Sequence, residues 1–142
     1  MTHKRQTIRD NLTTLLTGLT TTASNVFPSR VYPVEASAPP ALLIYVGSEE
    51  ADEESDSMGN TRTVAAEINI EVRDAKSTGL DDRLDTILEE VQAAIAGDRK
   101  LSGTLRKRID YLGIDGPEWN NEGDQEHASM IIQYRATYEV TL

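Results

Sequence analysis

The chain has 142 residues, a formal net charge of −10, 38% hydrophobic residues and no cysteine. This length and composition predict one globular domain over residues 1–142, and the lack of cysteine excludes a disulfide framework, a thiolate metal site and a cysteine nucleophile. The negative charge argues against non-specific nucleic-acid binding because phosphate is repelled, and the longest apolar run, residues 41–46, is too short to cross a membrane, so we expect a soluble intracellular protein.

The first predicted element is an amphipathic helix over residues 3–19, in which Gly18 offers a stop. Its apolar positions fall mainly three and four residues apart, at Ile8, Leu12, Leu15, Leu16 and Leu19. Residues 20–25 favour a loop, and residues 26–33 favour an edge strand because two prolines remove backbone donors. The apolar run over residues 41–46 predicts a short strand.

A strongly acidic segment follows, which we predict to be the long loop of a β-hairpin at about residues 48–60. Its acidic residues carry more than half of the net charge and are Glu49, Glu50, Asp52, Glu53, Glu54 and Asp56. Three interpretations stay open: a solvated loop, a divalent-cation site, or a segment that orders against a basic partner surface. The candidate basic side of such an interface is Arg62, Arg106, Lys107 and Arg108. In a ring of identical subunits, the acids of one copy would meet the bases of the next, whereas the alternative for these bases is a solvated strand face.

Residues 61–73 alternate between apolar and polar side chains, which predicts a strand with one buried face that pairs with residues 41–46. Its inward positions are Val64, Ala66, Ile68, Ile70 and Val72. A second amphipathic helix is predicted from Leu80 to Ile95, with Gly97 as its end and Ser77 or Thr78 as its cap. The aspartates in its first turns either compensate the helix dipole, which is the preferred interpretation, or bind a metal; they are Asp81, Asp82 and Asp85.

The C-terminal part predicts two further strands. One covers residues 105–112, with Ile109 and Tyr111 inward and Arg106 and Arg108 outward, and residues 113–125 are typical of turns. The other is the alternating stretch from Met130 to the chain end. The resulting order predicts an α+β fold, with a two-layer, mostly antiparallel sheet and two amphipathic helices packed on one face. The second face of the sheet is polar and must meet water or another subunit.

Catalytic signatures are missing from the sequence. His3 and His127 have no Ser, Cys or Asp neighbour at a spacing that indicates a triad, and no glycine-rich phosphate loop occurs. The sequence therefore predicts no catalytic residue, no cofactor and no metal site, and a protein that is not an enzyme.

Taken in chain order, these segments resemble the phage tail terminator family over nearly the full length. The similar segments are the helix start at residues 8–12, residues 29–33, the proline-led strand at residues 39–45, residues 61–63, the helix over residues 80–95 and the final strand at residues 134–142. The acidic hairpin loop departs from the family pattern.

The resemblance implies a structural virion protein. Such proteins form a homo-oligomeric, hexameric ring that caps the tail tube at its final length, block further addition of the major tube protein and present the surface to which the head attaches through its neck protein. DNA passes through the ring without specific binding. The resemblance also places the protein at the head-proximal end of the tail, and in the host cytoplasm during assembly. The alternatives are a neck or head–tail joining protein of similar fold, and a metal-dependent enzyme or regulatory domain that uses the aspartates near Asp81.

Overall fold

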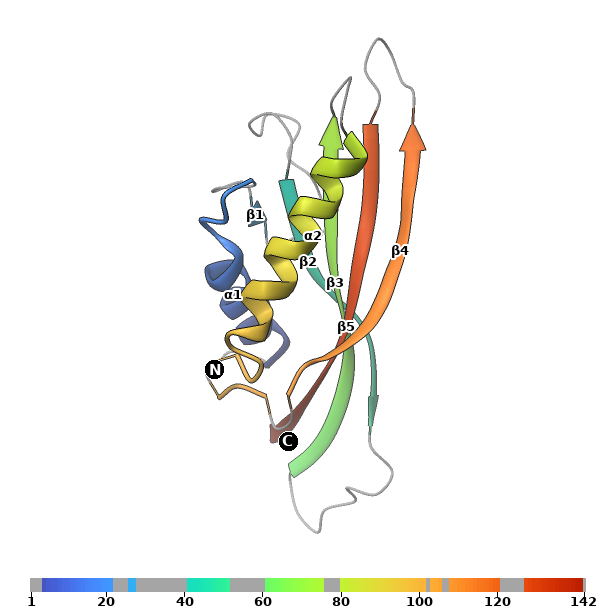
Figure 1. Ribbon diagram of the computed structural model, residues 1–142. Helices are drawn as coiled ribbons and strands as arrows, with labels where there is room; N and C mark the ends of the chain where they lie inside the picture. The colour runs from blue at the N-terminus through green and yellow to red at the C-terminus, as the bar shows by residue number, and fades with distance from the viewer. Residues whose placement is uncertain are drawn as a thin grey trace.

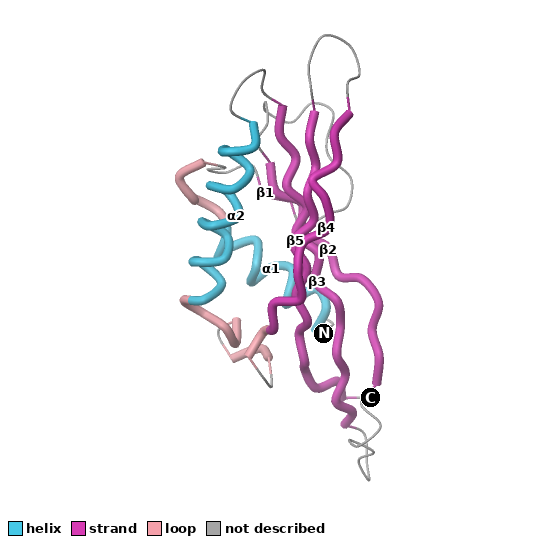
Figure 2. The backbone as a smooth tube through the Cα atoms, turned by 45° about the vertical axis from the view of Figure 1, so that its right-hand side comes forward, coloured by secondary structure: helices cyan, strands magenta, loops and turns pink. Residues whose placement is uncertain are grey.

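The computed structural model describes residues 4–21, 26–27, 41–51, 61–75, 80–101, 103–105, 108–120 and 127–141, which Figures 1 and 2 show from two directions. In chain order the elements are α1 (Lys4–Leu16), β1 (Val26–Phe27), β2 (Ala41–Ala51), β3 (Thr61–Ala75), α2 (Leu80–Ala96), β4 (Asp110–Asn120) and β5 (His127–Thr141). The strands form one sheet in the order β1-β2-β3-β5-β4. β1 is parallel to β2, and the other neighbouring pairs are antiparallel. Both helices lie on the same side of this sheet, which confirms the predicted α+β fold and element order.

Helix α1 packs one apolar stripe against the sheet. Ile8, Leu12 and Leu16 are four residues apart, so they share one side of the helix, and none of them has exposed surface. The helix ends at Leu16, and Gly18 follows with a φ of 95°. Glycine adopts this left-handed conformation without a steric cost, which is why it commonly ends helices. The helix is therefore shorter than the predicted span of residues 3–19.

Strands β2 and β3 form the predicted hairpin, and β3 alternates as the sequence indicates. Its buried helix-facing positions are the five predicted ones, Val64, Ala66, Ile68, Ile70 and Val72. β1 occupies the sheet edge beside the start of β2, where Val26 and Phe27 pair with Leu42 and Leu43. The rest of the predicted edge segment, residues 28–33, lies outside the described residues.

The strand predicted over residues 41–46 is longer than expected, because β2 continues to Ala51, and the rest of the predicted acidic loop lies outside the described residues. Glu49 pairs with Ala66 and Glu50 pairs with Ala65, so both glutamates belong to the strand. Strand β3 supplies backbone hydrogen-bond partners for β2 as far as Ala51. Glutamate is tolerated at the end of a strand because its side chain there reaches water.

Helix α2 follows its predicted boundaries closely. Leu84, Ile87, Val91 and Ile95 are buried, at 2% exposure or less, and the helix ends at Ala96, before Gly97. Near its start, the Nε atom of Arg83 lies 2.9 Å from Oδ2 of Asp74, a β3 residue whose side chain has no exposed surface. This ion pair connects the first turn of α2 to the end of β3. The predicted caps at residues 77 and 78 lie outside the described residues.

The fourth strand differs from the prediction in both position and length. β4 runs from Asp110 to Asn120, so residues 105–109 are not part of it, and residues 113–120 form strand instead of turns. β4 forms its backbone hydrogen bonds with the antiparallel strand β5. Two bulges, after Tyr111 and after Asp115, each place an extra β4 residue in this pairing and so accommodate the irregular sequence. At Gly116, where φ is 105°, an added Cβ would lie 3.1 Å from the carbonyl oxygen of Ser129, so only glycine fits without strain.

The final strand β5 confirms the predicted alternation. Its buried helix-facing residues include Met130, Ile132, Tyr134, Ala136 and Tyr138. The other side of the sheet is largely polar, as predicted: Gln133 donates to Glu67 at 3.1 Å, and the Tyr45 hydroxyl donates to Glu71 at 3.3 Å. One face of the sheet is therefore closed by the helices, and the opposite face presents polar side chains.

Candidate interaction surfaces

A β-bulge in β2 turns one acidic side chain toward the helices. The register shifts between Val46 and Glu49, where β2 has two residues opposite the single Glu67 of β3. An extra residue in one strand reverses the alternation that follows it. Glu49 consequently pairs with Ala66, on the helix-facing side, whereas an uninterrupted register would turn it to the opposite face.

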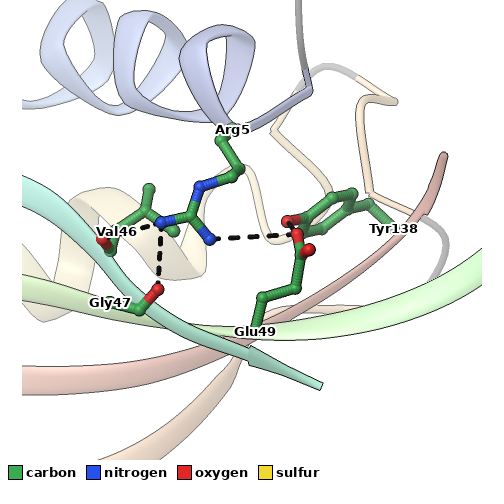
Figure 3. Close-up of polar contacts among 5 residues, drawn as sticks. All are labelled: Arg5, Val46, Gly47, Glu49 and Tyr138. Carbon is green, nitrogen blue, oxygen red and sulfur yellow. Dashed lines mark hydrogen bonds and ion pairs between the residues drawn. The ribbon is translucent and has the colours of Figure 1, made fainter. Parts of the chain in front are cut away.

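The bulge is held by an arginine from the first turn of α1 (Figure 3). Arg5 donates to the backbone carbonyl oxygens of Val46 and Gly47 at 3.1 and 3.0 Å, and its other terminal nitrogen lies 3.8 Å from Oε1 of Glu49. The hydroxyl of Tyr138 in β5 donates to that same carboxylate oxygen. We call Arg5, Glu49 and Tyr138 the helix anchor, because the three side chains join α1, β2 and β5 at one point.

The helix anchor is partly exposed on its charged side and buried on its aromatic side. The side chains of Arg5 and Glu49 are each 33% exposed, whereas Tyr138 has no exposed surface. Burial, followed by the hydrogen bond to Glu49 and the charge of that carboxylate, raises the pKa of Tyr138. The phenol therefore stays protonated and remains a hydrogen-bond donor at neutral pH. The contacts of the anchor position α1 relative to the end of the β2–β3 hairpin.

The residues of the predicted acid–base interface lie in several different places. Glu49 interacts within its own chain, and Glu50 is exposed one residue further along β2. Arg108 is exposed two residues before β4 begins. Arg62 belongs to β3, but its side chain lies outside the described part of the molecule. The same holds for the remaining candidates, Asp52, Glu53, Glu54, Asp56, Arg106 and Lys107.

The second surface is an apolar strip on β4, which we call the β4 strip. It consists of Tyr111, Leu112 and Ile114, which are 48%, 45% and 37% exposed, and these are the exposed large hydrophobic residues of the described structure. Tyr111 packs edge-on against Tyr134, with ring centroids 5.5 Å apart. Burial, with a smaller contribution from Tyr111, raises the pKa of Tyr134 to about 12.

The β4 strip is exposed because the helices do not reach it. Tyr111 pairs with Tyr134, and Ile114 pairs with Ile132, so both lie on the helix-facing side of the sheet. The helices pack mainly on β2, β3 and β5, and β4 is the edge strand farthest from α1 (Figure 1). The prediction that Tyr111 points inward is therefore correct for its face, but wrong for its burial.

Sequence reasoning missed both surfaces. The sequence does not predict the strip, because Gly113, Gly116 and Pro117 favour turns where β4 in fact continues. The signal that could have indicated it is the apolar pair Tyr111 and Leu112, followed by Ile114. The helix anchor has no signal in the sequence, because Tyr138 and Glu49 are 89 positions apart.

The predicted metal alternative finds no support in the geometry. Asp81, Asp82 and Asp85 are exposed on α2, and among the described residues no three His, Asp or Glu side chains gather in a way that could hold a metal ion. In the same part of the chain, neither helix has the length and apolarity needed to span a membrane. His127 begins β5, and His3 precedes the described residues.

Comparisons with known proteins give the chain a family. Among curated proteins, none matches it. A solved structure described as the virion of a native gene transfer agent particle contains a similar chain, with 17% identity over 97% of this chain and 92% of that one, at a TM-score of 0.37, a likeness too weak to carry an argument. The model of the family "Phage minor tail protein U" matches residues 3–138. This match includes both helices and nearly all of the sheet, and the chain therefore belongs to the phage minor tail protein U family, as a structural protein of the phage tail in the virion.

Proposed function

We propose that this tail protein is the terminator of the tail tube. Six copies form a ring at the head-proximal end of the finished tube, stop the addition of further tube protein and present the surface to which the neck protein attaches. The observation that carries this proposal is the family match over residues 3–138, since it assigns nearly the whole chain to a family of phage tail proteins.

The two edges of the sheet support a ring. A closed ring of identical subunits needs two different, mutually complementary patches on each copy. One edge of this sheet is formed by β1 and β2 and lies beside α1, whereas the other edge is β4 with its apolar strip. These edges differ in shape and chemistry, which favours a head-to-tail contact over a two-fold one.

The charge of the chain supports passage of DNA without binding. Each copy has a net charge of −10. A ring of such subunits repels the phosphate backbone, because like charges raise the energy of contact within a Debye length of about 8 Å at physiological salt. DNA that traverses the ring during ejection is therefore not retained on its wall.

Capping a tube is a mechanical role and requires no catalytic group. The terminator acts by occupying the end of the tube and by offering a different surface to the next component, so its function depends on the free energies of protein–protein contacts. We accordingly propose that the protein is not an enzyme, and that it assembles onto the tube in the host cytoplasm.

Electron microscopy of tails from a phage that lacks this gene tests the proposal. We expect tubes of irregular, excessive length that carry no heads, and normal tails after the gene is supplied in trans. Tails of normal length that only fail to join heads would contradict the terminator function and would identify a neck or head–tail joining protein instead.

A further inference from the structure

Both edges of the sheet are open in the part of the chain that the structure describes. β1 covers only Leu42 and Leu43 of β2, and no described strand lies beside β2 on that side from Gly47 to Ala51. β4 pairs with β5 on its inner side and is the last strand of the sheet on its outer side. Open edges present backbone donors and acceptors that another strand can pair with.

The two halves of β4 differ in how well they can accept a neighbour. The second half contains Pro117, which lies in the second bulge and has no N–H group to donate, whereas the first bulge, at Leu112, keeps its N–H group. The first half contains the β4 strip, in which Tyr111 and Ile114 continue the apolar helix-facing side of the sheet beyond the helices, and Leu112 lies exposed at the bulge between them. Contact with a further subunit is therefore favoured at residues 110–114.

The strand directions select the opposite edge of a second copy as the occupant. β2 is antiparallel to β3, β3 to β5, and β5 to β4, so β2 and β4 run in opposite directions. When the strands run along the ring axis, a copy that is rotated about this axis keeps its strand directions. Its β2 then lies antiparallel beside β4, which continues the alternation of the sheet, and its α1 comes to the side on which the β4 strip is uncovered.

The charges along the two edges agree with this arrangement. Asp110, the first residue of β4, pairs with Arg135, which pairs with Glu67 opposite the bulge of β2. Arg108 precedes this level by two residues and Glu50 follows the bulge in β2, so the two exposed charges lie toward the same end of the sheet, one near each edge. On the side of each residue that leads away from the strand, the sequence has the same sign, with basic residues at 106–107 and acidic residues at 52–54, whereas Asp110 at the start of β4 is acidic.

We infer that the β4 edge of each subunit lies antiparallel beside the β2 edge of the next subunit, with Arg108 next to the partner subunit's Glu50 and the β4 strip covered by that partner. This inference rests on the proposed ring and deepens it by naming the contact that closes it. It also gives the acidic end of β2 a role, because the acid faces a basic partner surface of the same chain.

Disulfide cross-linking tests the inference, since the native chain has no cysteine to interfere. Glu50→Cys and Arg108→Cys are prepared as separate proteins, mixed in equal amounts with purified tail tubes, and oxidised. We expect a covalent dimer from the mixture and none from either variant alone, because a head-to-tail contact pairs unlike positions. A chain with both substitutions is expected to give a ladder of covalent oligomers. The control pair replaces Arg108→Cys by Asp85→Cys, an exposed position on α2, and is expected to give no dimer.

The outcomes separate this inference from the proposed function. If electron microscopy shows copies of the protein in a ring on the tube, but the Glu50→Cys and Arg108→Cys mixture does not cross-link, the edge contact is wrong and the terminator function stands. Cross-linking of either variant with itself would indicate a two-fold contact and would also overturn the inference. If no copy binds the tube, the proposed function fails, and the inference fails with it.

Discussion

The helix anchor and the β4 strip lie on the same sheet, but the polar groups of the anchor are bonded within one chain, whereas the apolar side chains of the strip are exposed. At the anchor, a charged and a buried polar residue find their partners within one chain: Arg5 donates to two backbone carbonyls, and Tyr138 donates to Glu49. At the strip, three large apolar side chains remain in contact with water, which is unfavourable for each of them. The contacts of the first region stabilise the subunit, whereas the proposed contact between subunits covers the second region. Substitutions in the two regions should therefore affect different measurements.

The largest expected effect on subunit stability is at the buried side of the anchor. Tyr138→Ala removes a fully buried ring from between the sheet and α1 and leaves a cavity, so we expect a loss of about 3–5 kcal/mol in the free energy of unfolding, measured by urea denaturation. Tyr138→Phe is the matched control: it keeps the ring and removes only the hydroxyl donor to Glu49, for a loss of about 1 kcal/mol. Equal losses for the two variants would show that packing of the ring contributes little.

High pH should lower the free energy of unfolding through Tyr134, whose ring packs against Tyr111 of the β4 strip. The pKa of Tyr134 is about 12 in the folded protein and 10.0 ordinarily, so the folded state holds the phenol proton more tightly. This contribution to stability is complete below pH 10 and is lost as the pH rises from 10 to 12, at up to about 1.4 kcal/mol per pH unit. Denaturation curves of the wild type and Tyr134→Phe between pH 9 and 12 measure it. Identical pH profiles would contradict the assignment.

A smaller effect is expected on the charged side of the anchor. Arg5→Ala removes the donors to the carbonyls of Val46 and Gly47, and because the arginine is one-third exposed we expect a loss of about 1–2 kcal/mol in the free energy of unfolding. The neighbouring Lys4 is exposed, so Lys4→Ala is the control and should change stability by less than about 0.5 kcal/mol. If both variants behave alike, Arg5 does not hold the bulge.

The smallest effect on stability is expected at the β4 strip, together with the largest effect on assembly. Leu112→Glu places a charge on a side chain that is 45% exposed, so the free energy of unfolding should change by less than about 0.5 kcal/mol. Binding of the variant to purified tubes should fall at least about tenfold, because a charge is then buried between subunits. Ala93→Glu, on an exposed position of α2, is the control and should bind as the wild type does. A variant that unfolds, or one that still assembles, would remove the distinction between the two regions.

Much of the fold follows from the sequence because the relevant patterns are local. The spacing of Ile8, Leu12 and Leu16 predicts the buried side of α1, and the alternation from Val64 to Val72 predicts the buried side of β3. In each case the period of the secondary structure and the burial of one face agree, so neighbouring residues suffice for the prediction.

The functional surfaces depend on pairing between distant segments, which the sequence does not display. The face to which Glu49 points is decided by a bulge opposite Glu67, and its partners come from α1 and β5. β4 forms although Gly113, Gly116 and Pro117 disfavour a strand, because β5 supplies a complete partner along its length. Pairing between distant strands thus overrides local propensity at the bulge of β2 and along β4.

Complementation of the phage that lacks this gene with the Leu112→Glu protein tests the central claim most directly. In the proposed ring, each subunit folds by itself, and its β4 edge is completed by a second copy at the end of the tail tube. Electron microscopy should then show overlong tubes without heads, although circular dichroism and denaturation show a folded variant. Tails of normal length with heads attached, from the same variant, would contradict the account.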